Sequence, residues 1–212
     1  GTTLVTNADV HYCVTRTAGI LGLGAQNVER VPLDVRRRMD VDALDRTLKE
    51  LKQRGRAVMA VSACAGATPT GAFDDLKAIS DVCQRHGVWL HVDAAHGGAL
   101  LFSRKHRHRL EGIESADSIV WDAHKMLFIP ALCTAVLYRN REHRFETFQQ
   151  DAPYLFDPSA PGLADIDSGR FTEFDLSYGG DYTKWVRLAN SLRLRLAIRI
   201  SKVDSGKAKT EG

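Results

Sequence analysis

Apolar and polar residues follow two patterns along this chain, one typical of buried strands and the other of amphipathic helices. Continuous apolar runs at 57–63 and 88–92 are typical of parallel strands covered on both faces. The stretch after Asp40 instead places apolar residues at helical spacing. Further strands are predicted at 2–6, 28–32, 118–121 and 131–139, and helices at 9–21, 41–54 and 76–86. This alternation predicts an α/β fold with a mainly parallel sheet flanked by helices.

Several helix ends are predicted from single residues. Asp40 is expected to cap the helix that follows it, and Asp74 and Asp75 favour a helix N-terminus through the helix dipole. The GILGLG stretch follows a predicted helix rather than opening one. A C-cap at Gly22 or Gly24 therefore fits it better than a phosphate-binding loop.

Composition excludes some classes of protein. With 44% hydrophobic residues, the 212-residue chain can bury a core, and no apolar run is long enough to predict a membrane-spanning helix. No signal peptide is recognised, and the four cysteines form no CxxC pair. They are interpreted as reduced thiols of a cytoplasmic protein.

The net charge of +3 is unevenly distributed. Residues 184–212 hold 8 Lys and Arg against 2 Asp and Glu, so the rest of the chain is mildly acidic and gives no basis for nucleic-acid binding. Residues 192–200 alternate with a period of two, which predicts a half-buried strand with a basic face. The composition of 201–212 is typical of a disordered tail.

Two predicted strands end in residues that suit one chemistry. The run 88–92 ends on Asp93, and the run 118–121 is followed by Asp122, His124 and Lys125. Because sites form beyond the carboxyl ends of parallel strands, Asp93 and Lys125 are expected to face a single ligand. A lysine amine forms a Schiff base with the aldehyde of pyridoxal phosphate, and an aspartate keeps the pyridinium nitrogen of that cofactor protonated.

Three motifs carry a family resemblance: HVDAAHGG at 91–98, ADSIVWDAHKML at 116–127 and ACAGATPTGAFDDL at 63–76. At this spacing they resemble the group II pyridoxal-phosphate-dependent amino-acid decarboxylases, over roughly residues 3 to 169. The resemblance implies the large domain of fold type I, with pyridoxal 5'-phosphate as cofactor. It also implies a homodimeric carboxy-lyase that converts an L-amino acid to the corresponding amine and CO2.

The resemblance also implies roles for individual residues. Lys125 binds the cofactor covalently, Asp93 contacts its ring nitrogen, and His11 stacks on its ring. Thr68 and Ala95 lie near the cofactor, the first through its hydroxyl and the second against the ring face.

This chain departs from the family pattern at two positions near the expected site. Asp122 stands where the family usually has Asn, next to His124, and both positions normally help to hold the phosphate. A carboxylate there would repel a phosphate dianion. His96 replaces a residue that is often aromatic, which bears on the choice of substrate.

Family members are longer than this chain. The resemblance assigns 1–169 to the central part of the cofactor-binding large domain, with 170–200 a divergent segment and 201–212 a disordered tail. Residues 143–169 look loop-rich, and in the family a mobile loop from about this region closes over a neighbouring site. Tyr154 in it is a candidate proton donor to which no motif assigns a role.

Two further hypotheses remain open. His91, Asp93 and His96, with Asp122 and His124, could supply ligands to Zn²⁺ or Mn²⁺ in a metal-dependent hydrolase. Alternatively, the chain is an inactive remnant that keeps the fold. The histidines of the SRKHRHRL stretch, 103–110, are interpreted as part of a solvated connection and not as metal ligands.

Overall fold

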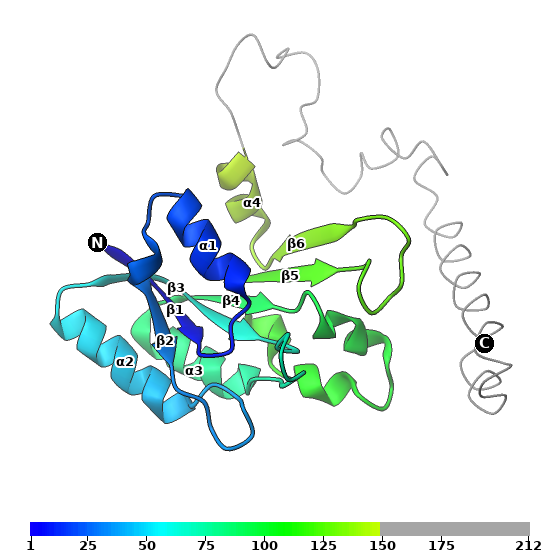
Figure 1. Ribbon diagram of the computed structural model, residues 1–212, viewed down its shortest axis with the longest axis horizontal. Helices are drawn as coiled ribbons and strands as arrows, with labels where there is room; N and C mark the ends of the chain where they lie inside the picture. Colours follow the sequence, from blue (N-terminus) through cyan, green and yellow to red (C-terminus); the bar gives the residue numbers. More distant parts are fainter. Residues whose placement is uncertain (149–212) are drawn as a thin grey trace, which may run out of the picture. The chain divides into compact units, whose positions relative to one another are not determined.

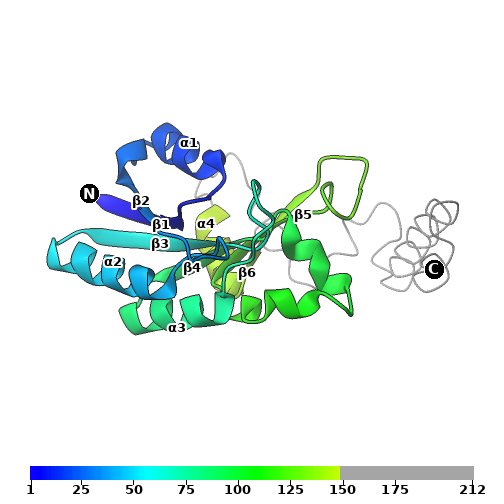
Figure 2. The ribbon, with the colours of Figure 1, turned by 60° about the horizontal axis from the view of Figure 1, so that its bottom comes forward.

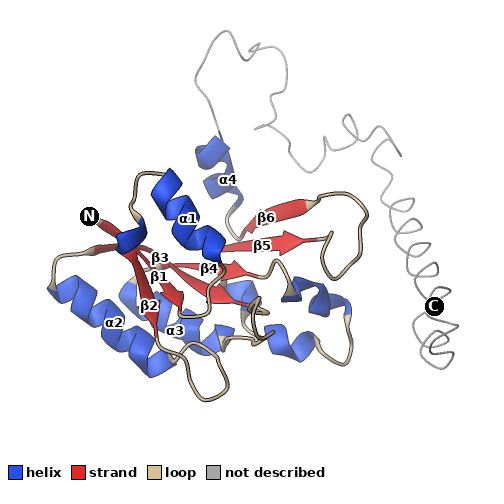
Figure 3. Cartoon of the chain, in the orientation of Figure 1, coloured by secondary structure: helices blue, strands red, loops and turns tan. Residues whose placement is uncertain are grey.

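The computed structural model describes residues 1–148, which form a six-stranded sheet with helices on both faces (Figures 1 and 3). The strands are β1 (Thr2–Asn7), β2 (Val28–Val31), β3 (Ala57–Cys64), β4 (Trp89–Asp93), β5 (Ser118–Asp122) and β6 (Thr134–Tyr138). The α-helices are α1 (Tyr12–Ile20), α2 (Val41–Gln53), α3 (Leu76–His86) and α4 (Arg141–Phe148).

The strand order is β2-β1-β3-β4-β5-β6, and all neighbouring pairs are parallel except β5 with β6. From β1 the chain crosses through α1 to β2 on one side, and from β2 it returns through α2 to β3 on the other side of β1. The strand order therefore reverses at β1. In open α/β sheets such a reversal leaves a crevice beyond the carboxyl ends of the strands, where ligands bind.

Helices cover the sheet unequally (Figure 2). Helix α1 lies on one face, and α2 and α3 lie side by side on the other. The buried faces of α2 and α3 pack against β3 and β4, and large side chains of this layer such as Leu44, Leu48, Ile79 and Leu90 are at most 2% exposed. This layer is the hydrophobic core, and it holds β3 and β4 in place as the centre of the sheet.

The structure confirms the predicted α/β sheet and the type of its strands and first three helices. Asp40 caps α2 by accepting a hydrogen bond from the backbone of Ala43, and α1 ends just before Gly22, whose φ is 75°. The long connection from β4 to β5 contains three short 3-10 helices, Gly97–Phe102, Arg107–Leu110 and Ile113–Ser115, and a fourth such helix, Ala25–Asn27, precedes β2.

The C-terminal predictions are only partly covered. The expected loop at 143–169 begins inside α4, so its first residues are helical. The rest of that loop with Tyr154, the strand at 192–200, the tail and the domain boundaries at 169 and 200 lie outside the described residues. Within residues 1–148, no helix combines the length and apolar character needed to cross a membrane.

Asp74 and Asp75 stand at the start of α3, as predicted, but Asp74 also has a buried role that the sequence did not indicate. Asp75 is the N-cap of α3 and accepts a hydrogen bond from the Ala78 backbone, whereas Asp74 is 4% exposed inside the fold. Its carboxylate accepts hydrogen bonds from the Asn7 side chain at 3.0 Å and from the backbone amides of Met39 and Cys64, each at 2.7 Å. One buried carboxylate thus joins the end of β1, the end of β3 and the residue before the cap of α2.

Substituting Asp74 by Ala is expected to lower the free energy of unfolding by about 3 kcal/mol, because three buried donors lose their acceptor. The neighbouring Asp75→Ala removes only the cap of α3 and is expected to cost about 1 kcal/mol. Urea unfolding of both variants measures the difference. Equal costs for the two variants would contradict the organising role of Asp74.

Candidate functional site

A cavity of ≈ 310 Å³ opens at the carboxyl ends of β3, β4 and β5. Six of the residues predicted for the site line it: His11, Thr68, Asp93, Ala95, Asp122 and Lys125. They come from four separate stretches of chain. The parallel strands bring these stretches together, as the reversal of strand order predicts.

Asp93 and Lys125 both face this cavity. Asp93 is the last residue of β4, and its Oδ1 accepts a hydrogen bond from the backbone N–H of Ala95 at 3.1 Å. Lys125 follows β5, and its Nζ lies 2.8 Å from Oδ2 of Asp122. The Lys125 amine therefore pairs with the carboxylate of its own turn, while Asp93 is held by the backbone of the turn that follows β4.

Asp122 is held from two sides. It is 8% exposed, and besides Lys125 it accepts a hydrogen bond from Oγ1 of Thr134 at 2.6 Å. The antiparallel pairing of β5 with β6 places these two residues opposite each other. Burial, the largest single effect, would raise the pKa of Asp122, but hydrogen bonds from Lys125 and Thr134, with the nearby charges of Lys125 and His124, outweigh it and leave the pKa below its usual value.

His124 is the one predicted site residue that does not line the cavity. Its Nδ1 lies against the backbone of Cys133, 3.2 Å from the amide nitrogen and 3.0 Å from the carbonyl oxygen. Its Nε2 is 3.9 Å from Asp122. The side chain therefore joins the turn after β5 to the start of β6.

His11 lies at the N-cap of α1, as its sequence position suggested. Its Nδ1 accepts a hydrogen bond from the backbone N–H of Cys13 at 3.3 Å, so a neutral ring carries its proton on Nε2. Cys13 also lines the cavity. Burial and then the nearby charge of Asp93 raise the pKa of the Cys13 thiol, which makes it a poor nucleophile.

Close backbone packing explains the small residues around the cavity. A Cβ at Gly97 would overlap the carbonyl oxygen of Ala65, and one at Gly98 would lie 2.6 Å from the Trp121 ring. Gly66 has φ 95° and packs against Gly97. The loop after β3 was expected to be small so that a ligand could approach. In the structure its small residues also let it pack on the turn after β4.

Sequence reasoning missed Thr134, Cys13 and Cys64 as lining residues. Thr134 could not be found because a strand pattern does not fix the register of an antiparallel pair. His96, noted as a departure from the family, does line the cavity.

The residues suggested for a metal are not arranged to bind one. The ring of His91 is turned to Ser118, with Nδ1 at 2.9 Å from Oγ, and burial lowers its pKa. Across the described part of the chain, no three His, Cys, Asp or Glu side chains are grouped to hold a metal ion.

Family models match two parts of the chain. The model described as the pyridoxal-dependent decarboxylase conserved domain matches residues 2–178. A second, described as Susd and RagB outer membrane lipoprotein, matches residues 156–212, which lie outside the described part of the structure.

The chain is also similar to individual proteins. It is 43% identical over 167 residues to cysteine sulfinic acid decarboxylase of Rattus norvegicus, covering 78% of this chain and 34% of the relative. It is 44% identical over 154 residues to the acidic amino acid decarboxylase GADL1 of Bos taurus, covering 72% and 30%. The crystal structure of mouse CSAD has a TM-score of 0.71 at 35% identity, covering 97% of this chain and 45% of that one. The chain thus spans about a third of the length of these curated relatives.

The contribution of Asp122 to stability is expected to depend on pH. Its folded-state pKa is lowered, so that contribution is present above about pH 4, the ordinary range of an Asp, and is lost as the pH falls through the folded-state value. Asp122→Asn is therefore expected to cost about 1 kcal/mol at neutral pH. Urea unfolding measured from neutral to acidic pH should show the difference from wild type shrinking as the pH falls.

Asp81→Asn is the matched control, since Asp81 is exposed and its side chain makes no ion pair or hydrogen bond within residues 1–148. A cost of Asp122→Asn that stays constant across the whole pH range would contradict the assigned role of its carboxylate.

Proposed function

The chain belongs to the pyridoxal-dependent decarboxylase family, and from that membership we propose that the protein uses pyridoxal 5'-phosphate to decarboxylate an L-amino acid to the corresponding amine and CO2. The observation that carries the proposal is that Asp93 and Lys125, from the ends of two neighbouring strands, face one cavity. A carboxylate and an amine in that arrangement are the two groups that this cofactor requires.

The residues present fit the cofactor. The cavity, at ≈ 310 Å³, is at the lower end of the size range of small-molecule sites, which is about 300–1,000 Å³. Its walls include the methyl side chain of Ala95 and the ring of His11, which suit the two faces of a flat ring. Thr68 adds a hydroxyl that can donate a hydrogen bond.

When bound, the cofactor supplies an electron sink for the electrons released as the carboxylate departs. The chain's own residues do the rest. Asp93 has one oxygen fixed by the Ala95 backbone and lines the cavity, where its carboxylate would hold a proton on a ring nitrogen of the cofactor. Lys125 supplies the amine for covalent attachment.

His11 lines the cavity and would offer an N–H donor to a ligand there. Because its Nδ1 is occupied by the Cys13 backbone, the ring is fixed in one orientation and Nε2 is left to contact a ligand. Its side chain can therefore both cover a ring face and donate one hydrogen bond.

Asp122 is assigned here to Lys125 rather than to the phosphate. Its carboxylate already accepts hydrogen bonds from Thr134 and Lys125, and a second negative charge beside a phosphate would be repulsive. We assign to Asp122 the task of holding the Lys125 amine at the cavity wall. His124 supports the same turn through the Cys133 backbone.

The substrate is proposed to be an acidic amino acid. Both curated relatives described above are named for such substrates, one for cysteine sulfinic acid and one for acidic amino acids. Homodimer formation and a cytoplasmic location are proposed with the family resemblance. The alternative of an inactive remnant predicts cofactor binding without release of an amine.

Titration of the purified chain with pyridoxal 5'-phosphate is expected to give the absorbance band of an imine between the cofactor aldehyde and a lysine amine. Borohydride reduction should then leave the cofactor attached to the peptide that contains Lys125. Lys125→Ala should abolish both signals. Lys52→Ala, which removes an exposed lysine on α2 outside the cavity, should leave them unchanged. A band that survives Lys125→Ala would remove this residue from the proposed chemistry.

Asp93→Ala tests turnover. With cysteine sulfinic acid, glutamate and aspartate offered in turn to the cofactor-loaded chain, at least one should yield an amine and CO2. Asp93→Ala should reduce that rate by about a hundredfold or more, because a charged partner of the reacting system is lost. Binding of the cofactor with no amine from any acidic amino acid would support the inactive alternative.

A further inference from the structure

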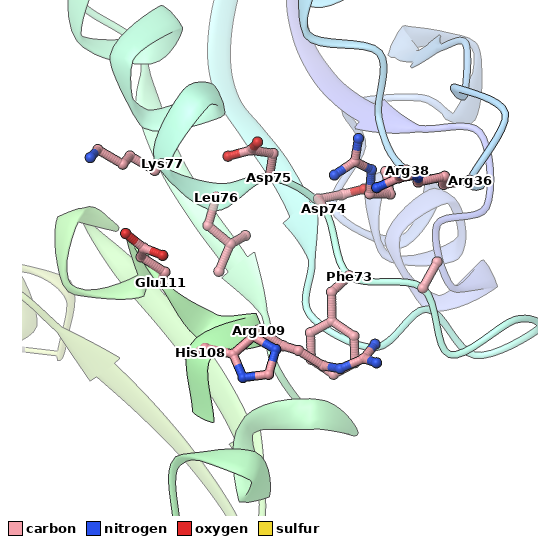
Figure 4. A pocket seen from close by; sticks show the side chains of 11 residues that line it. Arg36, Arg38, Phe73, Asp74, Asp75, Leu76, Lys77, His108, Arg109 and Glu111 are labelled. Carbon is pink, nitrogen blue, oxygen red and sulfur yellow. The ribbon is translucent and has the colours of Figure 1, made fainter. Parts of the chain in front are cut away.

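The structure has a second and larger cavity, of ≈ 610 Å³, whose lining residues are drawn in Figure 4. Its walls are the turn before α2, the segment 72–77 that leads into α3, and the 3-10 helix Arg107–Leu110 with Glu111. None of its lining residues lines the first cavity. The proposed reaction therefore leaves it without a role.

The charges around this cavity are unbalanced. Arg36, Lys77 and Arg109 line it and make no ion pair within residues 1–148, and the Arg109 guanidinium lies 5.8 Å from the centre of the Phe73 ring. On the acidic side, Asp74 is occupied by three donors and Asp75 caps α3. Glu111 is then the one lining carboxylate that has no hydrogen-bond or ion-pair partner in the described residues. Hydrogen bonds from uncharged donors leave the charges of Asp74 and Asp75 in place, so four cationic side chains, Arg36, Arg38, Lys77 and Arg109, stand against three carboxylates in the lining.

The turn that carries Arg36 has a specific construction. Oδ1 of Asp34 accepts hydrogen bonds from the backbone amides of Arg36 at 2.8 Å and Arg38 at 2.9 Å, and the Arg38 side chain pairs with Oδ2. Arg37 takes φ 64°, a conformation that is uncommon outside glycine, and its side chain binds Asp9. In this turn the side chain of Arg37 is therefore directed to Asp9, while Arg36 and Arg38 line the cavity.

We propose that this cavity binds a small organic dianion, with Arg36 and Arg109 each contacting one acidic group. Arginine suits carboxylate and phosphate groups because its guanidinium donates two parallel hydrogen bonds. Phe73 and Leu76 give the cavity an apolar wall for the carbon chain of the ligand (Figure 4). A purely inorganic anion would leave that wall unused.

Both cavities share supporting structure. The carbonyl of Ala72, in the wall of the second, accepts the N–H of Ala67, in the wall of the first, at 2.8 Å. Asp74 and Cys64 are joined in the same way by two hydrogen bonds. A dianion bound in the second cavity is therefore expected to change the affinity of the first cavity for the cofactor. This coupling rests on the proposed function, whereas the anion site itself does not.

Calorimetric titration of the cofactor-loaded chain with succinate tests the site, and inorganic phosphate in a parallel titration tests the need for a carbon chain. Succinate is expected to bind saturably at one site and more tightly than phosphate. Arg36→Gln and Arg109→Gln should each weaken succinate binding by about tenfold, the loss of one charge-assisted contact. Arg46→Gln, an exposed arginine on α2 outside the cavity, is the matched control and should have no effect.

Absence of saturable succinate binding, or equal weakening by Arg46→Gln, would overturn the site. Phosphate binding as tightly as succinate would overturn the assignment of an organic ligand. The coupling is tested by the cofactor's dissociation constant with and without succinate. A dissociation constant for the cofactor that is the same with and without succinate would overturn the coupling alone. A chain that binds succinate but no cofactor would overturn the proposed function and leave the anion site intact.

Discussion

The carboxylate of Asp74 is the interaction on which this end of the molecule depends. A charge taken out of water is costly unless it is fully hydrogen-bonded, and Asp74 meets that condition with three donors from three elements. Burial raises its pKa, while those donors act in the opposite direction. The ends of β1 and β3 and the entry to α2 are held in one arrangement as a result. Both cavities lie beside this junction, since Cys64 lines the first and Asp74 itself lines the second.

The first cavity is formed by strand ends that could not meet along the chain. β4 contributes Asp93, the turn after β5 contributes Lys125, and the pairing of β6 brings in Thr134. The ion pair with Asp122 has a consequence for the proposed chemistry, because the amine must leave this carboxylate to reach a ligand. Asp122 thus forms an ion pair with Lys125 when no ligand is bound. The two residues are only three positions apart in the chain, so this contact does not depend on distant segments.

The two cavities differ in what they present. The first offers the Asp93 carboxylate and the Lys125 amine from the ends of neighbouring strands, which suits a flat ligand contacted at both ends. The second offers four cationic side chains, three carboxylates and an apolar wall, and its excess of cations is the basis on which a flexible anion is proposed. Because both are supported by the segment from Cys64 to Leu76, a ligand that orders this segment in one cavity changes the free energy of binding in the other.

The sequence by itself determined the α/β alternation, the type of most elements and the position of Asp93 and Lys125 at the ends of two strands, because hydrophobic period and strand-end position are local properties. Seven residues were predicted from the sequence for the site, and six of them line one cavity in the structure. Their catalytic roles remain predictions. Only the tertiary structure decided that Asp74, at the start of α3, is also a buried junction, that Thr134 faces Asp122, that His124 turns to the Cys133 backbone, and that a second cavity exists. Each of these depends on the register and packing of segments distant in sequence, and no local pattern encodes which partner a polar side chain will meet.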